Sequence, residues 1–491
     1  MSMSAPDPLL ASVDALLAHA RGSACTSDAE AVLDEARTRL HGPLRVAVAG
    51  KVKAGKSTLL NALLGEELAA TDAGECTEIV TWYVRGETAQ VLVRPRDGAP
   101  QTRFFRRGAG AVEVDLGDWS AADIDAIEIR WPTERLRELT LLDTPGIASI
   151  RADISARTQR LLGEDERPPV VDAILYLIRH VHTSDVRFLE SFHDDDVARG
   201  TPMNAVGVLS RADEIGSCRL GALDVATAIA ERYQHDPRLR ALCPVVIPVA
   251  GLLAYAGATL REQEFRLLAA LAAGPEAELT ELLLTADRFA RRRSSLSLTE
   301  LEREHLLGRL GLFGVRLSVD LLRSRTVLSS AQLSAELLRQ SGLDQLRGVL
   351  TRQFTERSRV LKARSALLIV NGVLASGGCS EAAAVRARVE EVVAGAHEFE
   401  EVRILNALRA GAVVLGGDGG ARMDRLLGGA GHDPRSRLGL AVAAPDSDVR
   451  EAAVEELGRW QRQAEHPLSD RQAQIAARVT VRTLEGLLSK L

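Results

Sequence analysis

The pattern Gly-x-x-x-x-Gly-Lys-Ser at residues 50–57 constrains this chain more than any other stretch. It follows an apolar, β-branched run, Leu44 to Ala49, and it precedes residues 59–64, which favour a helix. A strand, a glycine-rich loop and a helix in this order form a phosphate-binding loop. Gly50 and Gly55 let several N–H groups point at one anion, and the helix adds its positive end. The sequence therefore predicts a nucleoside triphosphate site.

The residues of this loop are candidate ligands of the nucleotide. Lys56 would reach the β- and γ-phosphates, and the hydroxyl of Ser57 would hold Mg2+. The loop residues predicted to contact the nucleotide are Gly50, Lys51, Lys53, Ala54, Gly55, Lys56, Ser57 and Thr58.

A second motif, Asp143-Thr-Pro-Gly146, follows the predicted strand Leu139 to Leu142 directly. An aspartate at the tip of a strand beside the phosphate loop is placed to support Mg2+ binding. Gly146 can bring its backbone N–H to a γ-phosphate without a side-chain clash.

A threonine between these two motifs could complete the Mg2+ shell when the γ-phosphate is present. We choose Thr77, and Thr81 is the alternative; Thr77 could also do no more than begin a strand. The predicted metal-binding residues are Ser57, Thr77 and Asp143.

The stretch Ser210-Arg-Ala-Asp213 lies at the end of another predicted strand and favours guanine. GTPases place Asn/Thr-Lys-x-Asp here, and the aspartate accepts hydrogen bonds from the N1 and N2 groups of guanine. Asp213 keeps this function, and Arg211 supplies an apolar stem that stacks well on a base. Ala250 and Gly251, after the next strand, fit the loop whose N–H groups meet the guanine O6.

Short apolar runs alternate with helical patterns from residue 44 to Gly251, which predicts a mostly parallel sheet with helices on both faces. Helical patterns dominate the remainder of the chain. The expected fold is an α/β P-loop GTPase domain with an all-α helical bundle. The expected domains are N-terminal helices at 1–42, a GTPase domain at 43–345 with a helical segment at about 260–335, and a helical bundle at 346–491. We expect the N-terminal helices to join this bundle.

Composition excludes several other classes of protein. A net charge of −6 gives no general attraction to nucleic acid. Five scattered cysteines without a C-x-x-C pair suit reduced thiols better than disulfides or zinc. Neither a secretory signal nor an apolar run of about 20 residues is visible, so we expect a soluble, cytoplasmic protein.

Together these motifs resemble those of the bacterial dynamin-like GTPases, and most closely those of the isoniazid-inducible Ini branch and its C members. The resemblance rests on residues 50–58, Cys76-Thr77, Asp143 to Gly146 and Ser210 to Glu214. It implies slow hydrolysis of GTP to GDP with Mg2+, a peripheral location at the inner face of the cell membrane, and membrane remodelling linked to drug tolerance. The implied partners are anionic lipid and a second GTPase domain, either of this chain or of a related subunit; nucleic acid is not implied.

The phosphate loop and its surroundings depart from the dynamin pattern. Dynamins have Gln and Ser where this chain has Val52 and Lys53, and the serine helps to hold a catalytic monovalent cation. We hypothesise that the ammonium of Lys53 replaces that cation; the alternative is a solvent-facing lysine that only raises affinity. Ile147 stands where a glutamine could orient the attacking water, so that task falls to Thr77 and backbone groups. The predicted catalytic residues are Lys53, Thr77 and Gly146.

The membrane contact and the function both have alternatives. Residues Leu367 to Leu374 and Gly411 to Leu415 are candidate membrane tips, although core is the favoured interpretation of each. A membrane-acting GTPase is one hypothesis, and a nucleotide-gated binding subunit with little hydrolysis is another. A ribosome-associated GTPase is disfavoured because no basic RNA-binding extension is visible.

Overall fold

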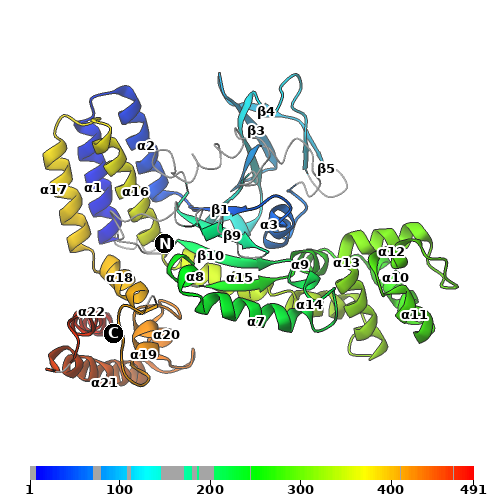
Figure 1. Ribbon diagram of the computed structural model, residues 1–491. Helices are drawn as coiled ribbons and strands as arrows, with labels where there is room; N and C mark the ends of the chain where they lie inside the picture. Colours follow the sequence, from blue (N-terminus) through cyan, green and yellow to red (C-terminus); the bar gives the residue numbers. More distant parts are fainter. Residues whose placement is uncertain are drawn as a thin grey trace.

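The computed structural model describes residues 7–69, 79–107, 112–144, 171–179, 185, 186, 189, 204–243, 245–409, 411–467 and 469–491. A nine-stranded sheet with the order β11-β10-β9-β1-β8-β2-β7-β3-β4 occupies the centre (Figure 1). Its strands are β1 (Leu44–Gly50), β2 (Val80–Arg85), β3 (Gln90–Pro95), β4 (Gln101–Arg103), β7 (Ile124–Trp131), β8 (Leu139–Asp143), β9 (Ala173–Ile178), β10 (Ala205–Ser210) and β11 (Val246–Val249).

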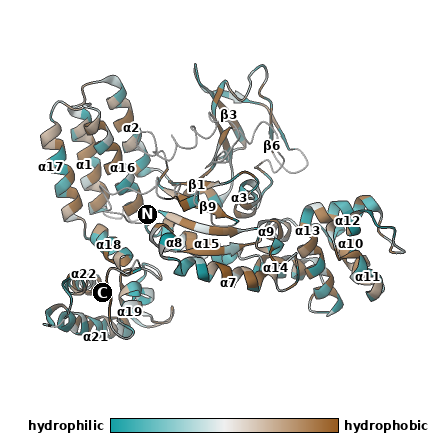
Figure 2. Ribbon diagram, viewed as in Figure 1, coloured by the Kyte–Doolittle hydropathy of each residue, from teal (hydrophilic) through white to brown (hydrophobic). Residues whose placement is uncertain are grey.

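The predicted mostly parallel sheet is confirmed. Strand β1 pairs in parallel with β8 and β9, and β10 pairs in parallel with β9 and β11. Antiparallel pairing joins β2 to β8 and adds β3 and β4 beyond β7. Figure 2 shows apolar residues concentrated in the central strands, as expected for parallel strands that are buried on both faces.

Three short strands were not predicted. Strand β4 ends the large sheet, and β5 (Phe105–Arg107) pairs with β6 (Val112–Val114) in a separate ribbon. Each has three residues, which is too short for a hydrophobic period to be visible in the sequence. The ribbon is held by tertiary contact, because the Phe105 and Trp131 rings meet edge to face with centroids 6.3 Å apart.

Helices cover the sheet and extend from one end of it. The elements next to the sheet are α3 (Lys56–Leu64), η2 (Glu134–Leu136), η3 (Ala212–Glu214), α7 (Ala222–His235), α8 (Pro237–Leu242) and α9 (Gly251–Ala258). The helical segment that follows comprises α10 (Glu262–Ala272), α11 (Glu276–Leu282), α12 (Ala286–Arg291), α13 (Glu300–Arg323) and α14 (Ser330–Gln340). It shares a separate core with α9 and lies at the end of the molecule opposite the N-terminal helices (Figure 1).

The two N-terminal helices do join the C-terminal part of the chain. Helices α1 (Pro8–Gly22) and α2 (Ser27–His41) lie side by side with α16 (Ser358–Ala375) and α17 (Ala382–Gly395) (Figure 1). Their buried residues belong to the same hydrophobic core as those of β1 and α3. The N-cap of α2 is Thr26, whose hydroxyl accepts a hydrogen bond from the Ala29 N–H at 3.1 Å.

The chain from Leu343 to Ala375 carries apolar residues at helical spacing, but it does not form one long helix. Helix α15 (Leu343–Leu350) ends in a π-helical turn, η4 (Thr351–Thr355), before α16 begins. The break places Arg357 in the interior, where its Nε donates to His432 Nε2 at 2.9 Å and its Nη2 donates to Gly428 O at 2.7 Å. His432 and Gly428 are 75 and 71 residues away from Arg357 in the sequence, so the local pattern could not reveal these contacts.

The remaining helices form a C-terminal lobe with its own core. They are α18 (His397–Arg409), α19 (Gly419–Leu426), α20 (Pro434–Leu438), α21 (Asp446–Glu465) and α22 (Arg471–Leu488). Met423, Trp460 and Leu484 are among the buried side chains of this lobe. The helices after residue 346 therefore pack as two groups rather than one bundle.

The structure separates the two candidate membrane tips. Residues Leu367 to Leu374 lie on α16 inside the bundle, and Leu367 and Val370 are both 0% exposed, so this stretch is core and not a tip. In the loop after α18, Val413 is buried but Val414 is 78% exposed. None of the described helices combines the length and the apolarity needed to cross a membrane.

Candidate functional site

The phosphate loop joins β1 to α3, as predicted. Gly50 has a φ of 151°, and a Cβ at this position would lie 2.9 Å from Leu177 O on β9, so no larger residue fits there. Gly55 precedes α3 with a φ of 91°, and a Cβ there would face open space. No side chain caps α3. The first N–H groups of the helix are thus left for an anion, which is how helix N-termini bind phosphate.

Lys56 lies over this loop. Its Nζ is 3.3 Å from Gly50 O and 3.4 Å from Lys51 O. Burial lowers the pKa of Lys56, and the nearby Asp143 carboxylate acts in the opposite direction. A desolvated ammonium interacts more strongly with phosphate than one in water does, because the effective dielectric constant is lower.

Ser57 and Asp143 form the part of the site that fits Mg2+. Asp143 ends β8, which pairs with β1, and this pairing brings the Ser57 hydroxyl within hydrogen-bonding distance: Oγ donates to Asp143 Oδ2 at 3.0 Å. Burial raises the pKa of Asp143 to about 6, against the opposing effects of Lys56 and Ser57. Hydroxyl and carboxylate oxygens are the donors that Mg2+ prefers beside phosphate and water. Within the described part of the chain no group of three or more His, Cys, Asp or Glu side chains offers an alternative metal site.

The two other lysines of the loop differ in their surroundings. Lys51 Nζ lies 3.1 Å from Asp185 Oδ2, and the Tyr176 hydroxyl donates to the other oxygen of that carboxylate at 2.8 Å. The Lys51 side chain is therefore directed to Asp185, which leaves its backbone N–H as its contribution to phosphate binding. Lys53 is exposed and has a left-handed backbone with a φ of 61°.

A cavity of about 210 Å³ joins the phosphate loop to the predicted base-recognition residues. It lies between the loop, the end of β10 and the start of α9. Its lining residues are Ala54, Gly55, Thr58, Leu59, Leu177, Val208, Ser210, Arg211, Asp213, Glu214, Val249, Gly251 and Leu252. The structure thus brings together residues that the sequence places up to 200 positions apart.

Asp213 is the charged group best placed to recognise a base. It is 6% exposed, and burial raises its pKa to about 6. The neighbouring Arg211 has a left-handed φ of 54° and donates through Nη1 to Glu214 Oε1 at 2.6 Å. The Ser210 hydroxyl donates to Ile178 O at 3.3 Å, so it fastens the end of β10 to β9.

The assignment of Ala250 to the base requires correction. Its N–H donates to Ser341 O at 2.9 Å, and its side chain is buried beside α9. That N–H is therefore not available for a guanine O6. Gly251, the first residue of α9, lines the cavity, and α9 has no side-chain cap. The N–H groups of the first turn of α9, from Gly251 onward, are therefore the remaining candidates for a contact with the base.

Two predicted catalytic residues, Thr77 and Gly146, lie outside the described residues, so their roles stay predictions. The alternative Thr81 is buried on β2, opposite Asp143 in the ladder, and its hydroxyl donates to Ile79 O at 3.4 Å. These contacts give Thr81 the character of a strand residue rather than a ligand of Mg2+.

Sequence patterns missed several polar residues around the site. Asn61 on α3 is 0% exposed, and its Oδ1 accepts from the N–H groups of Leu68 at 3.0 Å and Ala69 at 2.7 Å. A single asparagine within an otherwise apolar helical stretch was the available signal. Arg309 and Arg316 on α13 contact the segments that follow α3 and Asp213, at Glu67 and Ser217, and nothing local in the sequence marks these two arginines.

Comparison with known proteins agrees with this geometry. Residues 46–210, which span the phosphate loop, Asp143 and β10, match the Dynamin family. The chain is 38% identical over 458 residues to the isoniazid-induced protein IniC of Mycobacterium tuberculosis, in strains CDC 1551 / Oshkosh and ATCC 25618 / H37Rv, and the alignment covers 93% of this chain and 92% of IniC.

Two further matches carry descriptions as bacterial dynamins. A bacterial dynamin-like protein of Nostoc punctiforme is 27% identical over 179 residues, covering 34% of this chain and 25% of that protein. A solved bacterial dynamin pair, described as oligomerised and as sensing and tethering membranes, aligns over 98% of this chain and 75% of its own at 13% identity with a TM-score of 0.30. The 38% identity over nearly the full length of both chains decides the assignment: this chain belongs to the IniC family of bacterial dynamin-like proteins.

Proposed function

We propose that the protein binds GTP with Mg2+, hydrolyses it slowly to GDP and phosphate, and uses this cycle at a membrane surface. The observation that carries the proposal is that one continuous cavity runs from the phosphate loop to Asp213 and Gly251. The Ser57–Asp143 pair lies at the phosphate end of the site. A guanine nucleotide would fit this cavity with its phosphates near the Lys56 ammonium and its base near the Asp213 carboxylate.

Each group has a defined task in this proposal. Lys56 and the first N–H groups of α3 hold the β- and γ-phosphates, and Ser57 and Asp143 hold Mg2+. When bound, Mg2+ neutralises charge on the phosphates. Asp213 accepts hydrogen bonds from the base. Thr77 and Gly146 are proposed to orient the attacking water and the γ-phosphate.

Lys53 is proposed to neutralise charge between the β- and γ-phosphates. We expect Lys53→Ala to slow single-turnover phosphate release about tenfold while the Kd for GDP stays within about twofold, because a charge that stabilises only the transition state affects the rate and not the binding. Val52→Ala is the matched control, since Val52 is the exposed neighbour in the same turn. Weaker GDP binding with an unchanged rate would instead make Lys53 a lysine that only raises affinity.

The remainder of the proposal concerns location and assembly. We place the protein in the cytoplasm at the inner face of the membrane, with a neck at 1–42, a GTPase domain at 43–345 and a helical trunk at 346–491. Anionic lipid and a second GTPase domain, from another copy or a related subunit, are the proposed partners. Membership of a family of dynamin-like proteins supports this. The exposed Val414 in the C-terminal lobe is the proposed lipid contact.

Phosphate release from GTP and from ATP, with and without anionic liposomes, tests the proposed function. We expect release from GTP and not from ATP, and a higher rate with lipid. Flotation of the protein with the same liposomes should be lost in a folded Val414→Asp variant. Tight GTP binding with negligible release under every condition would favour a nucleotide-gated binding subunit. Failure to bind GTP would overturn the proposal.

A further inference from the structure

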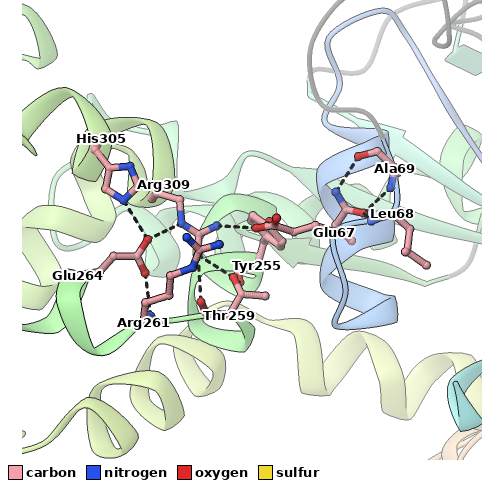
Figure 3. A network of polar contacts seen from close by, with 10 residues as sticks. Glu67, Leu68, Ala69, Tyr255, Thr259, Arg261, Glu264, His305 and Arg309 are labelled. Carbon is pink, nitrogen blue, oxygen red and sulfur yellow. Dashed lines mark hydrogen bonds and ion pairs between the residues drawn. The ribbon is translucent and has the colours of Figure 1, made fainter. Parts of the chain in front are cut away.

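Arg309 is the centre of a polar network that joins the segment after α3 and the end of α9 to the helical segment (Figure 3). It projects from α13, and its Nε donates to Glu264 Oε1 on α10 at 2.7 Å. Its Nη2 donates to Thr259 O at 3.1 Å and to Thr259 Oγ1 at 2.8 Å. Its Nη1 lies 3.7 Å from Glu67 Oε1, on a segment that follows the phosphate-loop helix. One guanidinium therefore contacts three separate parts of the chain.

Glu67 is also held by Tyr255 of α9. The Tyr255 hydroxyl donates to Glu67 Oε1, and the guanidinium of Arg309 lies over the Tyr255 ring with its Cζ 4.9 Å from the centroid. The Arg309 side chain is 15% exposed and that of Glu67 26%. An ion pair that is partly shielded from water in this way, with a cation–π contact behind it, is stronger than a surface pair.

The same segment is fixed from its other side by the phosphate-loop helix. Asn61 on α3 accepts from the N–H groups of Leu68 and Ala69, and its Nδ2 donates to Ala69 O at 2.8 Å. Helix α3 begins with Lys56 and Ser57, and α9 begins with Gly251 at the cavity. Residues 67–69 thus lie between two helices that both start at the nucleotide site.

Helix α13 contacts the base end of the site as well. Gly311 interrupts the helix with a φ of 67°, and a Cβ there would lie 3.3 Å from Leu252 Cδ2 and 3.8 Å from Asp213 Oδ2. One turn and a half later, Arg316 donates to Ser217 O at 3.0 Å, in the loop that follows Asp213. A single helix therefore meets both the segment after α3 and the surroundings of Asp213.

The two carboxylates beside Arg309 are not equivalent. Glu264 is 2% exposed and also accepts from the Arg261 N–H at 2.9 Å, and His305 Nε2 lies 3.2 Å away. Glu67 is less buried and is bound only through its oxygen Oε1 in the contacts to Tyr255 and Arg309. Arg309 is therefore held more closely by Glu264, at 2.7 Å, than by Glu67, at 3.7 Å.

We infer that Arg309 is a positioning residue for GTP hydrolysis, which acts through Glu67 to hold residues 67–69 between the phosphate-loop helix and the helical segment α10–α13. The inference rests on the proposed function. Residues 67–69 are bonded to Asn61 of α3, the helix that begins with Lys56 and Ser57, so their placement can set how these two residues are aligned during hydrolysis. Among the described residues, Glu67, Tyr255 and Arg309 do not line the cavity, so none of the three is placed to contact the nucleotide directly.

The test compares turnover with affinity in variants of the full-length protein. We expect Glu67→Gln and Arg309→Gln each to lower kcat for GTP about tenfold, while the Kd values for GDP and for a non-hydrolysable GTP analogue stay within about twofold. Tyr255→Phe removes one hydrogen bond and should lower kcat about threefold. Arg309→Lys keeps the charge and should recover part of the loss. Glu67→Gln combined with Arg309→Gln should be no worse than either alone, because both remove the same contact.

Arg323→Ala is the matched control. Arg323 is on the same helix and donates to Ala272 O at 3.1 Å and Gly274 O at 2.9 Å, both inside the helical segment. This variant should keep the wild-type kcat. Hydrogen exchange of residues 262–323 supplies a readout independent of turnover: protection should differ between the GDP-bound and analogue-bound wild type, and Glu67→Gln should remove the difference.

Each alternative result has a distinct meaning. Wild-type kcat in Glu67→Gln and Tyr255→Phe, both of which leave the Arg309–Glu264 pair in place, would overturn the inference even if Arg309→Gln does not fold. An equal loss of kcat in Arg323→Ala would also overturn it, because the effect would then be one of general stability. A wild-type protein that binds no GTP would instead overturn the proposed function, and the inference with it.

Discussion

Lys56→Ala is expected to weaken GTP binding by at least about 100-fold and to abolish measurable phosphate release. Loss of one partner from a desolvated charge pair costs about 2–5 kcal/mol, which corresponds to roughly 30- to 5,000-fold in affinity. The Lys56 ammonium lies 3.3 Å from Gly50 O, over the loop that receives the phosphates, so it is such a partner. Titration with a fluorescent GTP analogue and a phosphate-release assay would measure both effects.

Lys51→Ala is the control for this prediction, since it removes the same charge from the same loop. The Lys51 ammonium is paired with Asp185, so we expect a much smaller loss of affinity. The nucleotide-free Lys56→Ala protein should be at least as stable as the wild type to heat, because burial of the ammonium lowers the pKa of Lys56 and disfavours its charged form in the folded state. Equal losses in the two variants would mean that the net charge of the loop, and not the place of Lys56, determines affinity.

Asp213→Asn is expected to weaken GDP binding about 100-fold and to make xanthine nucleotides the better ligands. Hydrogen bonds to a charged group contribute about 1.5–3 kcal/mol each, and guanine offers the Asp213 carboxylate two donors. Xanthine has a carbonyl where guanine has its amino group, and that carbonyl can accept from the amide of the variant. Competition of GDP, XDP and ADP against labelled GDP would measure the change. A variant that still prefers GDP over XDP would remove Asp213 from base recognition.

The same carboxyl should make GDP affinity depend on pH. Burial raises the pKa of Asp213 to about 6, and the ionised form is the one that accepts both donors of guanine. GDP affinity should therefore fall as the pH drops from 7.5 through 6 to 5.5. The phosphates of GDP also titrate, so the contribution of Asp213 is the part of the fall that Asp213→Asn lacks. In the nucleotide-free protein, the raised pKa stabilises the fold at pH below about 4, and this contribution is lost as the pH rises through 6.

The parts of the site that the sequence predicted depend on short-range patterns. The phosphate loop is a contiguous motif, and the strands that end at Asp143 and Ser210 are apolar runs bounded by polar residues. Parallel strands joined by helical crossovers leave their carboxyl ends at one edge of the sheet, so the ends of these two strands lie on the same side as the phosphate loop. The position of Asp213 near the loop is thus a consequence of topology.

The parts that the sequence did not predict depend on contacts between distant segments. The N–H of Ala250 is bonded to Ser341, and no local rule could show that it is unavailable to a base. The helical stretch is interrupted before Arg357, and the Arg357 guanidinium is bonded to His432 and Gly428 of the C-terminal lobe. Arg309 has no motif, since its role comes from Glu67 and Glu264 on other elements.

The pairing of α1 and α2 with α16 has a consequence for synthesis on the ribosome. These two helices leave the ribosome first, and the buried faces of Val13, Leu16 and Leu33 have no bundle partner until α16 has been made. At about 5–20 residues per second, the roughly 300 intervening residues take on the order of tens of seconds to translate. During that time the GTPase sheet can form while the first helices still expose apolar surface. A nascent chain of this protein is therefore expected to bind ribosome-associated chaperones until α16 has been made and packs against α1 and α2.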